Sequence, residues 1–131
     1  MTAPGDYADL MPFAKLLGIS ITHATPAEAV GTMTWTEALT TTAGGMHGGA
    51  LMALADSTAA VCAFLNLPPG AGTSTTSSST VFTRGVRAGT VTATARPLHV
   101  GRSTIALVTE IRDGDGKLVA QVTQSQAVLG G

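Results

Sequence analysis

Asp56 is the acidic residue of this chain whose surroundings need an explanation. It lies within a run rich in alanine and leucine, whereas the other seven carboxylates lie near the termini, in expected loops and turns, or on expected strands. A carboxylate among apolar side chains is unfavourable unless it is hydrogen-bonded, solvated in a cleft or protonated. A hydrogen bond that fixes packing and a catalytic role as base or nucleophile both meet this condition. Both interpretations of Asp56 therefore stay open.

A possible site for an anionic oxygen lies just before this run, at His47, Gly48 and Gly49. The first N–H groups of a helix have no partner within the helix, and glycine lets a ligand approach the backbone closely. A helix that begins here could therefore bind an anionic oxygen. His47 is interpreted either as a histidine bonded to backbone or as a direct participant in the chemistry.

The spacing of these residues indicates that one chain cannot complete the site. If Gly48 and Asp56 are both helical, they are about 12 Å apart along the axis, at about 1.5 Å per residue. His47 and Asp56 would lie on opposite faces, because nine residues turn a helix by about 900°. Two antiparallel helices in a dimer would instead bring Gly48 close to the partner's Asp56. The spacing therefore predicts a site shared by two subunits.

The elements that must position these residues are predicted from composition and periodicity. Residues 50–67 are apolar around nearly the whole circumference and rich in helix-forming residues, which predicts a buried helix too short and too polar to span a membrane. A short amphipathic helix is expected over 7–17, ending at Gly18. Strands are expected over 19–23, 29–36, 80–86, 89–100, 103–113 and 117–129, with a polar loop over 72–79.

Two local signals refine the strand prediction. Asp113-Gly114-Asp115-Gly116 is typical of a hairpin turn, so the sheet should be antiparallel. Pro97 predicts a bulge or an edge position, because proline cannot donate to a strand ladder. Together the elements predict one α+β domain over residues 1–131, in which a curved antiparallel sheet wraps around a long central helix.

The composition limits the partners and the compartment. The chain has 131 residues, with 7 basic and 8 acidic side chains and a formal net charge of −1, which argues against nucleic-acid binding and against a polybasic membrane module. Only 11% of residues are charged and 44% are hydrophobic, so we expect a homo-oligomer that covers apolar surface. One cysteine, Cys62, is expected to be a packed core residue, and without an apparent signal peptide the cytoplasm is the expected location. No metal site is expected.

The run from Gly44 through His47-Gly48-Gly49 to Leu54-Ala55-Asp56 resembles the PaaI-type acyl-CoA thioesterases. These enzymes have the hotdog fold and belong to the superfamily of 4-hydroxybenzoyl-CoA thioesterase. Flanking segments strengthen the resemblance, namely Leu17-Gly18-Ile19, Val100-Gly101-Arg102 and residues 116–120. The resemblance implies a homodimer or dimer of dimers that hydrolyses an acyl-CoA to a carboxylic acid and free coenzyme A. No separate cofactor is implied, because coenzyme A is part of the substrate.

The resemblance also implies roles for individual residues. Asp56 would be the nucleophile or the general base, and the Gly48 N–H of the other subunit would polarise the thioester carbonyl. Gly49 would permit close approach of the substrate, and His47 would order the loop and the substrate end of the site. Thr75 would assist Asp56 across the interface, with Ser74 beside it.

Two further features follow from the resemblance. Thr41 stands where such enzymes often have an asparagine that helps to orient water or the carbonyl group. Whether Thr41 takes over this role is an expectation to be tested. Arg84, Arg87 and Arg102 are the cations expected near the coenzyme A phosphates. Two other functions stay open at this point: a non-catalytic module that binds acyl-CoA or an acyl carrier protein, and a hydratase that acts on enoyl-CoA.

Overall fold

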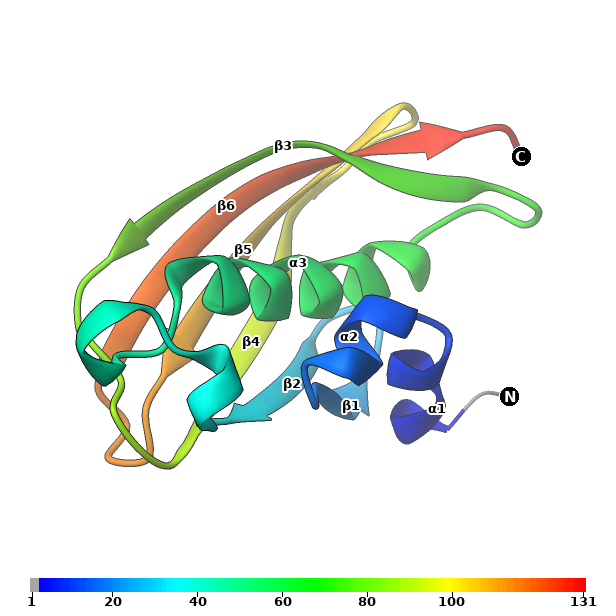
Figure 1. Ribbon diagram of the computed structural model, residues 1–131. Helices are drawn as coiled ribbons and strands as arrows, with labels where there is room; N and C mark the ends of the chain where they lie inside the picture. Colours follow the sequence, from blue (N-terminus) through cyan, green and yellow to red (C-terminus); the bar gives the residue numbers. More distant parts are fainter. Residues whose placement is uncertain (1–2) are drawn as a thin grey trace.

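Residues 3–131 of the computed structural model form one curved antiparallel sheet with a long helix against its concave face (Figure 1). The strand order is β1-β2-β4-β5-β6-β3, so β1 and β3 are the edges. The strands are β1 Ser20–Ala24, β2 Ala29–Thr34, β3 Gly72–Phe82, β4 Thr90–Val100, β5 Thr104–Arg112 and β6 Leu118–Leu129. The predicted α+β architecture is confirmed.

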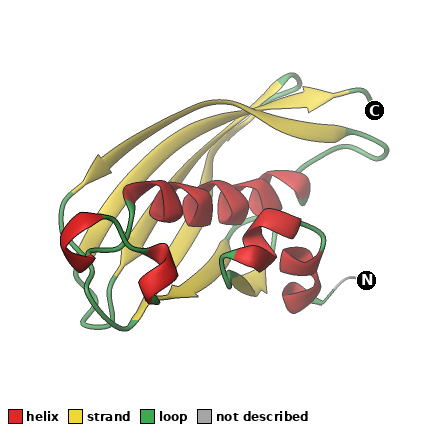
Figure 2. Ribbon diagram, in the orientation of Figure 1, coloured by secondary structure: helices red, strands yellow, loops and turns green. Residues whose placement is uncertain are grey.

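The central helix, α3, spans Gly48–Phe64 and lies across the concave face of the sheet (Figure 2). On β4, Val91, Ala93 and Ala95 alternate toward the helix and are fully buried. Small residues let the two layers approach each other. At Gly31 of β2, an added Cβ atom would collide with Thr58 Oγ1 of α3, so only glycine fits beneath the helix at that point.

One face of α3 is left uncovered by the rest of the chain. Met52 is 39% exposed and Phe64 is 52% exposed, and Asp56 lies half-buried between them. Residues at this spacing lie on one side of a helix. The full stripe consists of Gly49, Met52, Ala53, Asp56, Ser57, Ala60 and Phe64. The prediction that α3 is covered on all sides is therefore met only on the side facing the sheet.

The N-terminal segment forms two short helices, so the prediction of one helix over residues 7–17 is wrong. Helix α1 spans Pro4–Asp9 and α2 spans Pro12–Leu16. Pro12 occupies the start of α2, where its missing N–H needs no partner, and the same ring could not continue α1. Gly18 follows α2 with a φ of 75°, as expected for a residue that ends a helix.

The polar segment 72–79 is strand and not loop. Strand β3 pairs with β6 from Gly72 opposite Leu129 to Phe82 opposite Ala120, and it ends before the predicted limit at residue 86. Its serines and threonines gave no strand signal in the sequence, because an edge strand with little buried surface does not need alternating apolar residues. The predicted hairpin turn at residues 113–116 and the predicted bulge at Pro97 are confirmed. Among residues 3–131, no helix is long and apolar enough to cross a membrane.

Candidate active site

The Asp56 carboxylate is held by two hydrogen bonds to the same oxygen. Thr75 Oγ1 donates to Asp56 Oδ1 at 2.7 Å, and Gln124 Nε2 donates to Oδ1 at 3.0 Å. Within residues 3–131, Oδ2 accepts no hydrogen bond from a protein group. One oxygen therefore fixes the orientation of the carboxylate, and the other is available for chemistry.

A second glutamine extends this arrangement along the sheet. Gln126 Nε2 donates to Thr75 Oγ1 at 2.9 Å, and Gln126 Oε1 lies 3.1 Å from Thr73 Oγ1, whose single proton is shared between this oxygen and Ala127 O at 2.9 Å. Gln124 and Gln126 are each 1% exposed, on β6, while Thr73 and Thr75 belong to β3. The two edge-proximal strands thus connect to the α3 carboxylate through a polar network, which we call the Asp56 network: Asp56, Thr73, Thr75, Gln124 and Gln126.

Asp56 faces a groove that runs along the open side of α3. A cavity of about 320 Å³ is lined by Asp56 together with Phe13, Gly49, Met52, Ala53, Ser57, Thr75 and Ser78. A neighbouring cavity of about 330 Å³ is lined in part by His47 and shares Phe13 and Gly49 with the first. The two cavities therefore adjoin along the open side of α3, from the start of the helix to Asp56, and we refer to them together as the groove.

His47 is the N-cap of α3. Its Nδ1 accepts the Gly49 N–H at 2.7 Å, which occupies one of the free donors of the first turn. The Gly48 N–H has no acceptor within residues 3–131. A Cβ atom on Gly48 would lie 3.1 Å from Phe82 Cζ, so a side chain at this position would crowd the aromatic ring. The available donor at the helix start is thus that of Gly48.

Thr75 is in contact with Asp56, but in a different way from the one that the resemblance implied. The hydrogen bond joins two residues of one chain and not two residues across a subunit interface. Ser74 lies next to Thr75 on β3, where alternation turns its side chain to the opposite face of the sheet. Thr76 Oγ1 bonds instead to Ser125 O at 3.2 Å. Of the three hydroxyl residues, Thr75 alone contacts Asp56.

Thr41 lies in the connection between β2 and α3, which contains the 3-10 turns η1 Glu37–Leu39 and η2 Thr42–Gly44. Its backbone N–H donates to Gly45 O at 2.9 Å. No hydrogen bond connects Thr41 with Asp56 in one chain. The structure therefore does not bring these two predicted site residues together within a protomer.

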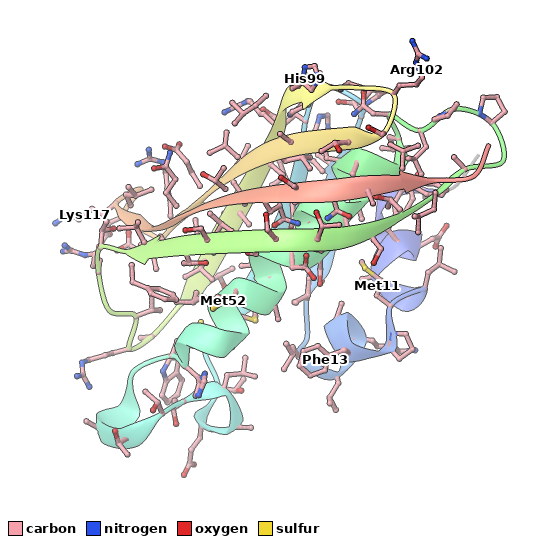
Figure 3. All side chains as sticks on the ribbon, turned by 90° about the horizontal axis from the view of Figure 1, so that it is seen from above. Met11, Phe13, Met52, His99, Arg102 and Lys117 are labelled. Atoms are coloured by element: carbon pink, nitrogen blue, oxygen red, sulfur yellow. The ribbon has the colours of Figure 1, made fainter. Side chains whose placement is uncertain are left out.

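The predicted phosphate-binding arginines fall into two groups. Arg84 Nε lies 3.4 Å from Asp113 Oδ2, and Arg84 lines a cavity together with Gly48. Arg87 donates to the carbonyl of Ala43, so both arginines lie near the start of α3. Arg102 lies in the β4–β5 connection, at the opposite end of the sheet from Lys117 (Figure 3). Within one protomer, Arg102 therefore lies far from Arg84 and Arg87.

Cys62 is a packed residue on the sheet side of α3. It is fully buried, and its Sγ lies 3.6 Å from Pro26 O. Burial, together with the nearby charge of Glu28, raises the pKa of the thiol to about 11. A thiol of this kind is protonated at neutral pH and is a poor nucleophile.

Sequence reasoning missed the two glutamines. Val122, Gln124 and Gln126 are spaced by two residues on β6, and all three side chains are buried. Their spacing from Val122 is the signal that could have identified them, since alternate residues of a strand share a face. Phe13 and Ser78 of the groove gave no comparable signal.

Comparison with known proteins identifies the family. The model of the thioesterase superfamily matches residues 43–120. A relative from Vibrio cholerae is 38% identical over 58% of this chain and 51% of its own length, so the chain spans about half of that protein. A relative from Mycobacterium tuberculosis is 32% identical over 85% of this chain and 81% of its own length. Both relatives carry the name "Putative esterase".

Solved structures agree with this family. The structure of the mycobacterial protein has a TM-score of 0.89 and 30% identity, covering 92% of this chain and 98% of that one. The thioesterase HI1161 of Haemophilus influenzae has a TM-score of 0.92 and 25% identity, covering 99% and 92% of the two chains. The chain therefore belongs to the thioesterase superfamily and is a thioester hydrolase built on the hotdog fold.

Proposed function

We propose that the protein hydrolyses acyl-CoA thioesters to a carboxylic acid and free coenzyme A, as a PaaI-like member of the family, with Asp56 as the reacting carboxylate. The observation that carries this proposal is the asymmetry of the Asp56 carboxylate. Thr75 and Gln124 hold Oδ1 at 2.7 and 3.0 Å, while Oδ2 accepts no hydrogen bond within residues 3–131 and Asp56 lines the groove along α3. A preorganised carboxylate of this kind suits attack on a thioester or activation of water.

Two reaction routes fit this geometry. As a nucleophile, Asp56 Oδ2 bonds to the acyl carbon, the C–S bond breaks, coenzyme A leaves as the thiolate, and water then hydrolyses the mixed anhydride. As a general base, Oδ2 takes a proton from the water that attacks the acyl carbon, and the thiolate again leaves. Borohydride treatment during turnover separates the routes, because it reduces an aspartyl anhydride to homoserine, which mass spectrometry detects at position 56.

The reaction also needs a donor for the developing oxyanion, and we assign this role to the Gly48 N–H of a second subunit. Gly48 and Asp56 lie on the same helix about 12 Å apart, too far to meet at one carbonyl carbon. Strand β3 is an unpaired edge of the sheet, and the stripe of α3 that contains Asp56 is uncovered. A second copy pairing along β3 would cover that stripe and set two α3 helices antiparallel. We therefore propose a homodimer, alone or as a dimer of dimers, with two shared sites.

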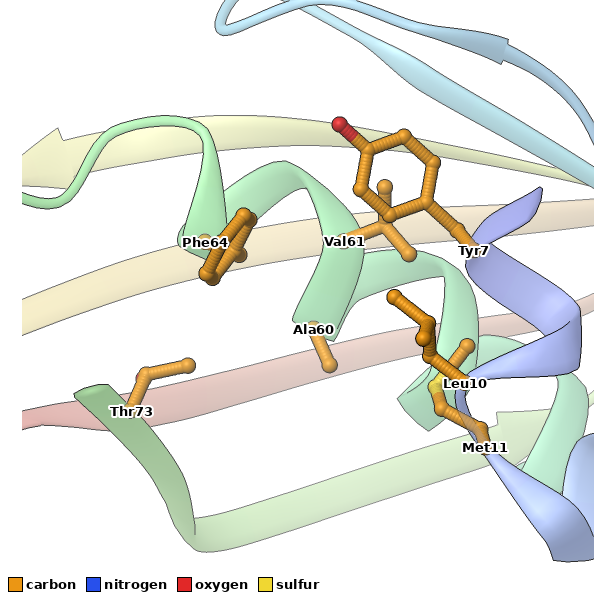
Figure 4. A pocket seen from close by; sticks show the side chains of 7 residues that line it. All are labelled: Tyr7, Leu10, Met11, Ala60, Val61, Phe64 and Thr73. Atoms are coloured by element: carbon orange, nitrogen blue, oxygen red, sulfur yellow. The ribbon is translucent and has the colours of Figure 1, made fainter. Parts of the chain in front are cut away.

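We assign the acyl group to an apolar cavity of about 190 Å³, whose lining residues Figure 4 shows. Ala60 lies one helical turn beyond Asp56, and Thr73 is the residue of β3 that precedes Thr75 on the same face. Tyr7 and Phe64 make an edge-to-face contact with ring centroids 6.4 Å apart. The complete lining is Tyr7, Leu10, Met11, Ala60, Val61, Phe64 and Thr73. Such a lining favours a hydrocarbon or aromatic acyl group over a charged one.

Arg84 and Arg87 are the residues of the phosphate-binding group that lie near the start of α3. A cavity of about 410 Å³ is lined by Gly48, Phe82 and Arg84, among others, on this side of the helix. We propose that both arginines attract the coenzyme A phosphates there, through the planar donor geometry of the guanidinium group. Arg102 would belong to the same phosphate site only if a second subunit supplied it.

The proposal is tested by release of free thiol from a panel of acyl-CoA substrates. Asp56→Asn keeps the shape of the side chain and removes its charge, so we expect kcat to fall about 100-fold or more with the fold intact. Asp115→Asn, in the exposed β5–β6 turn, is the matched control and should hydrolyse normally. Unchanged turnover in Asp56→Asn would refute the assignment. Binding of acyl-CoA without thiol release by the native protein would indicate a binding module, and water addition to enoyl-CoA a hydratase.

A further inference from the structure

Gln124 occupies a place where an apolar residue would be expected. It follows Val122 on the concave face of β6 and is 1% exposed, with Leu107 as its neighbour on β5. A glutamine side chain carries two donors and two acceptor lone pairs that burial removes from water. Packing alone would be served better by a side chain without polar atoms. The residue therefore needs a reason that packing does not supply.

The orientation of the Gln124 amide is set by Asp56. Its Nε2 donates to Asp56 Oδ1 at 3.0 Å, while its Oε1 is buried with no hydrogen-bond partner within residues 3–131. Turning the amide over would give Oε1 new surroundings but place it against the carboxylate, where two acceptors repel. The amide thus leaves its own oxygen unsatisfied in order to donate to Asp56.

We propose that Gln124 is a positioning residue for the Asp56 carboxylate, which it holds turned so that Oδ2 points into the groove. This inference rests on the proposed function of Asp56. Thr75 alone would leave the carboxylate free to rotate about its single hydrogen bond, whereas two donors on Oδ1 fix its plane. Gln126 supports the same arrangement one step away, because its Nε2 donates to Thr75 Oγ1 at 2.9 Å.

The small number of ionisable groups near Asp56 allows this inference to be tested by a pH–rate profile. Within residues 3–131, no other ionisable side chain lines its cavity, and the groups facing it from β3 and β6 are the neutral Thr75 and Gln124. The next ionisable group along the groove is His47, which lines the adjoining cavity. A change at position 124 should therefore act on the acidic side of the pH–rate profile through Asp56 itself.

The test compares Gln124→Met, which keeps the length of the side chain and removes the donor, with Gln121→Met on the exposed face of the same strand. For Gln124→Met we expect kcat to fall about tenfold or more, KM to change by less than about twofold, and the acidic limb of the kcat/KM profile to move to higher pH. Gln121→Met should match the native enzyme in all three. A native kcat and pH profile in Gln124→Met would overturn the inference.

A second variant keeps the inference testable if Gln124→Met does not fold. Gln124→Glu preserves size and polarity and places a second carboxylate next to Asp56, so the acidic limb should move further toward high pH, since two like charges at this distance resist joint ionisation. An unchanged profile would again overturn the inference. Failure of this inference can be told apart from failure of the proposed function. If the Gln124 variants behave like the native enzyme while Asp56→Asn is inactive, only the positioning role of Gln124 is refuted.

Discussion

Thr75 Oγ1 and Asp56 Oδ1 lie 2.7 Å apart, and this contact joins the edge strand β3 to the central helix α3. The same hydroxyl accepts from Gln126 Nε2, so its proton is directed toward the carboxylate. A residue on an edge strand of the sheet thus helps to orient the Asp56 carboxylate, which we propose as the reacting group.

We expect Thr75→Val to reduce kcat by about 10- to 100-fold, because it removes a hydrogen bond to a charged group while keeping the shape of the side chain. Steady-state hydrolysis of an acyl-CoA measures the effect. Thr76→Val, which loses only a bond to Ser125 O, is the control and should keep most of the activity. Equal activity of the two variants would contradict the role assigned to Thr75.

Subunit mixing tests whether two protomers build each site. Gly48→Pro removes the N–H at the first position of α3, where proline is tolerated by a helix, although the Phe82 ring must shift slightly. In a mixed dimer of Gly48→Pro and Asp56→Asn protomers, one shared site has both native groups. Random mixing of the two inactive variants should therefore restore about a quarter of the native activity.

Absence of any restored activity in mixtures shown to contain heterodimers would mean that each site lies within one protomer. Thermal melting of each parent variant provides the control, because both must be folded and dimeric before they are mixed. Mixing of either parent with itself gives the baseline.

Acyl selectivity should respond to the apolar cavity. Ala60→Leu fills part of its volume of about 190 Å³, so kcat/KM should fall for long-chain and aromatic acyl-CoA substrates and stay nearly unchanged for acetyl-CoA. Ala88→Leu, on an exposed loop, is the control for added apolar volume. The measurement is the ratio of kcat/KM for a long-chain or aromatic acyl-CoA to kcat/KM for acetyl-CoA. A uniform loss for all acyl groups would place the acyl site elsewhere.

The β5–β6 turn should make stability depend on pH through Asp113. The backbone N–H of Lys117 is the main cause that lowers the Asp113 pKa below its ordinary value of 3.8, and the Asp115 N–H and the Arg84 charge add to it. A carboxyl whose pKa is lower in the folded state stabilises the fold above its unfolded pKa, and this contribution is lost as pH falls through the folded pKa.

Asp113→Asn should therefore have a lower free energy of unfolding than the native protein at neutral pH. The difference should shrink as the pH is lowered below about 4, where the native carboxyl also becomes neutral. Urea titrations at several pH values measure it, with Asp115→Asn as the control. A difference that stays constant across this range would mean that the charge of Asp113 is not responsible.

The order of the elements could be predicted from the sequence, because strong local signals mark most of them. The apolar segment around Asp56 forms α3, Val91, Ala93 and Ala95 alternate into the core, and the Asp113–Gly116 turn closes a hairpin. These features depend on residues close in the chain. The break at Pro12 is also local, and the hydrophobic spacing across it outweighed that signal in the prediction.

The rest depends on contacts between distant residues. Segment 72–79 becomes a strand because β6 supplies its hydrogen-bond partners, about fifty residues later in the chain. Gln124 meets Asp56 across 68 positions, a relation that no local pattern encodes. The candidate nucleophile was thus predictable from its unusual neighbours, whereas the groups that hold it became visible only in three dimensions.

Strand β3 lies at the margin of the sheet with β6 as its neighbour, yet it carries Thr73 and Thr75 of the Asp56 network. Edges fray before interiors do. When β3 unfolds locally, the helix and the other strands can stay folded, but the Asp56 carboxylate loses its hydrogen bond to Thr75. Mild heat or denaturant should therefore abolish activity before the whole protein unfolds. Binding of a second copy along β3 would stabilise the active state more than it stabilises the core.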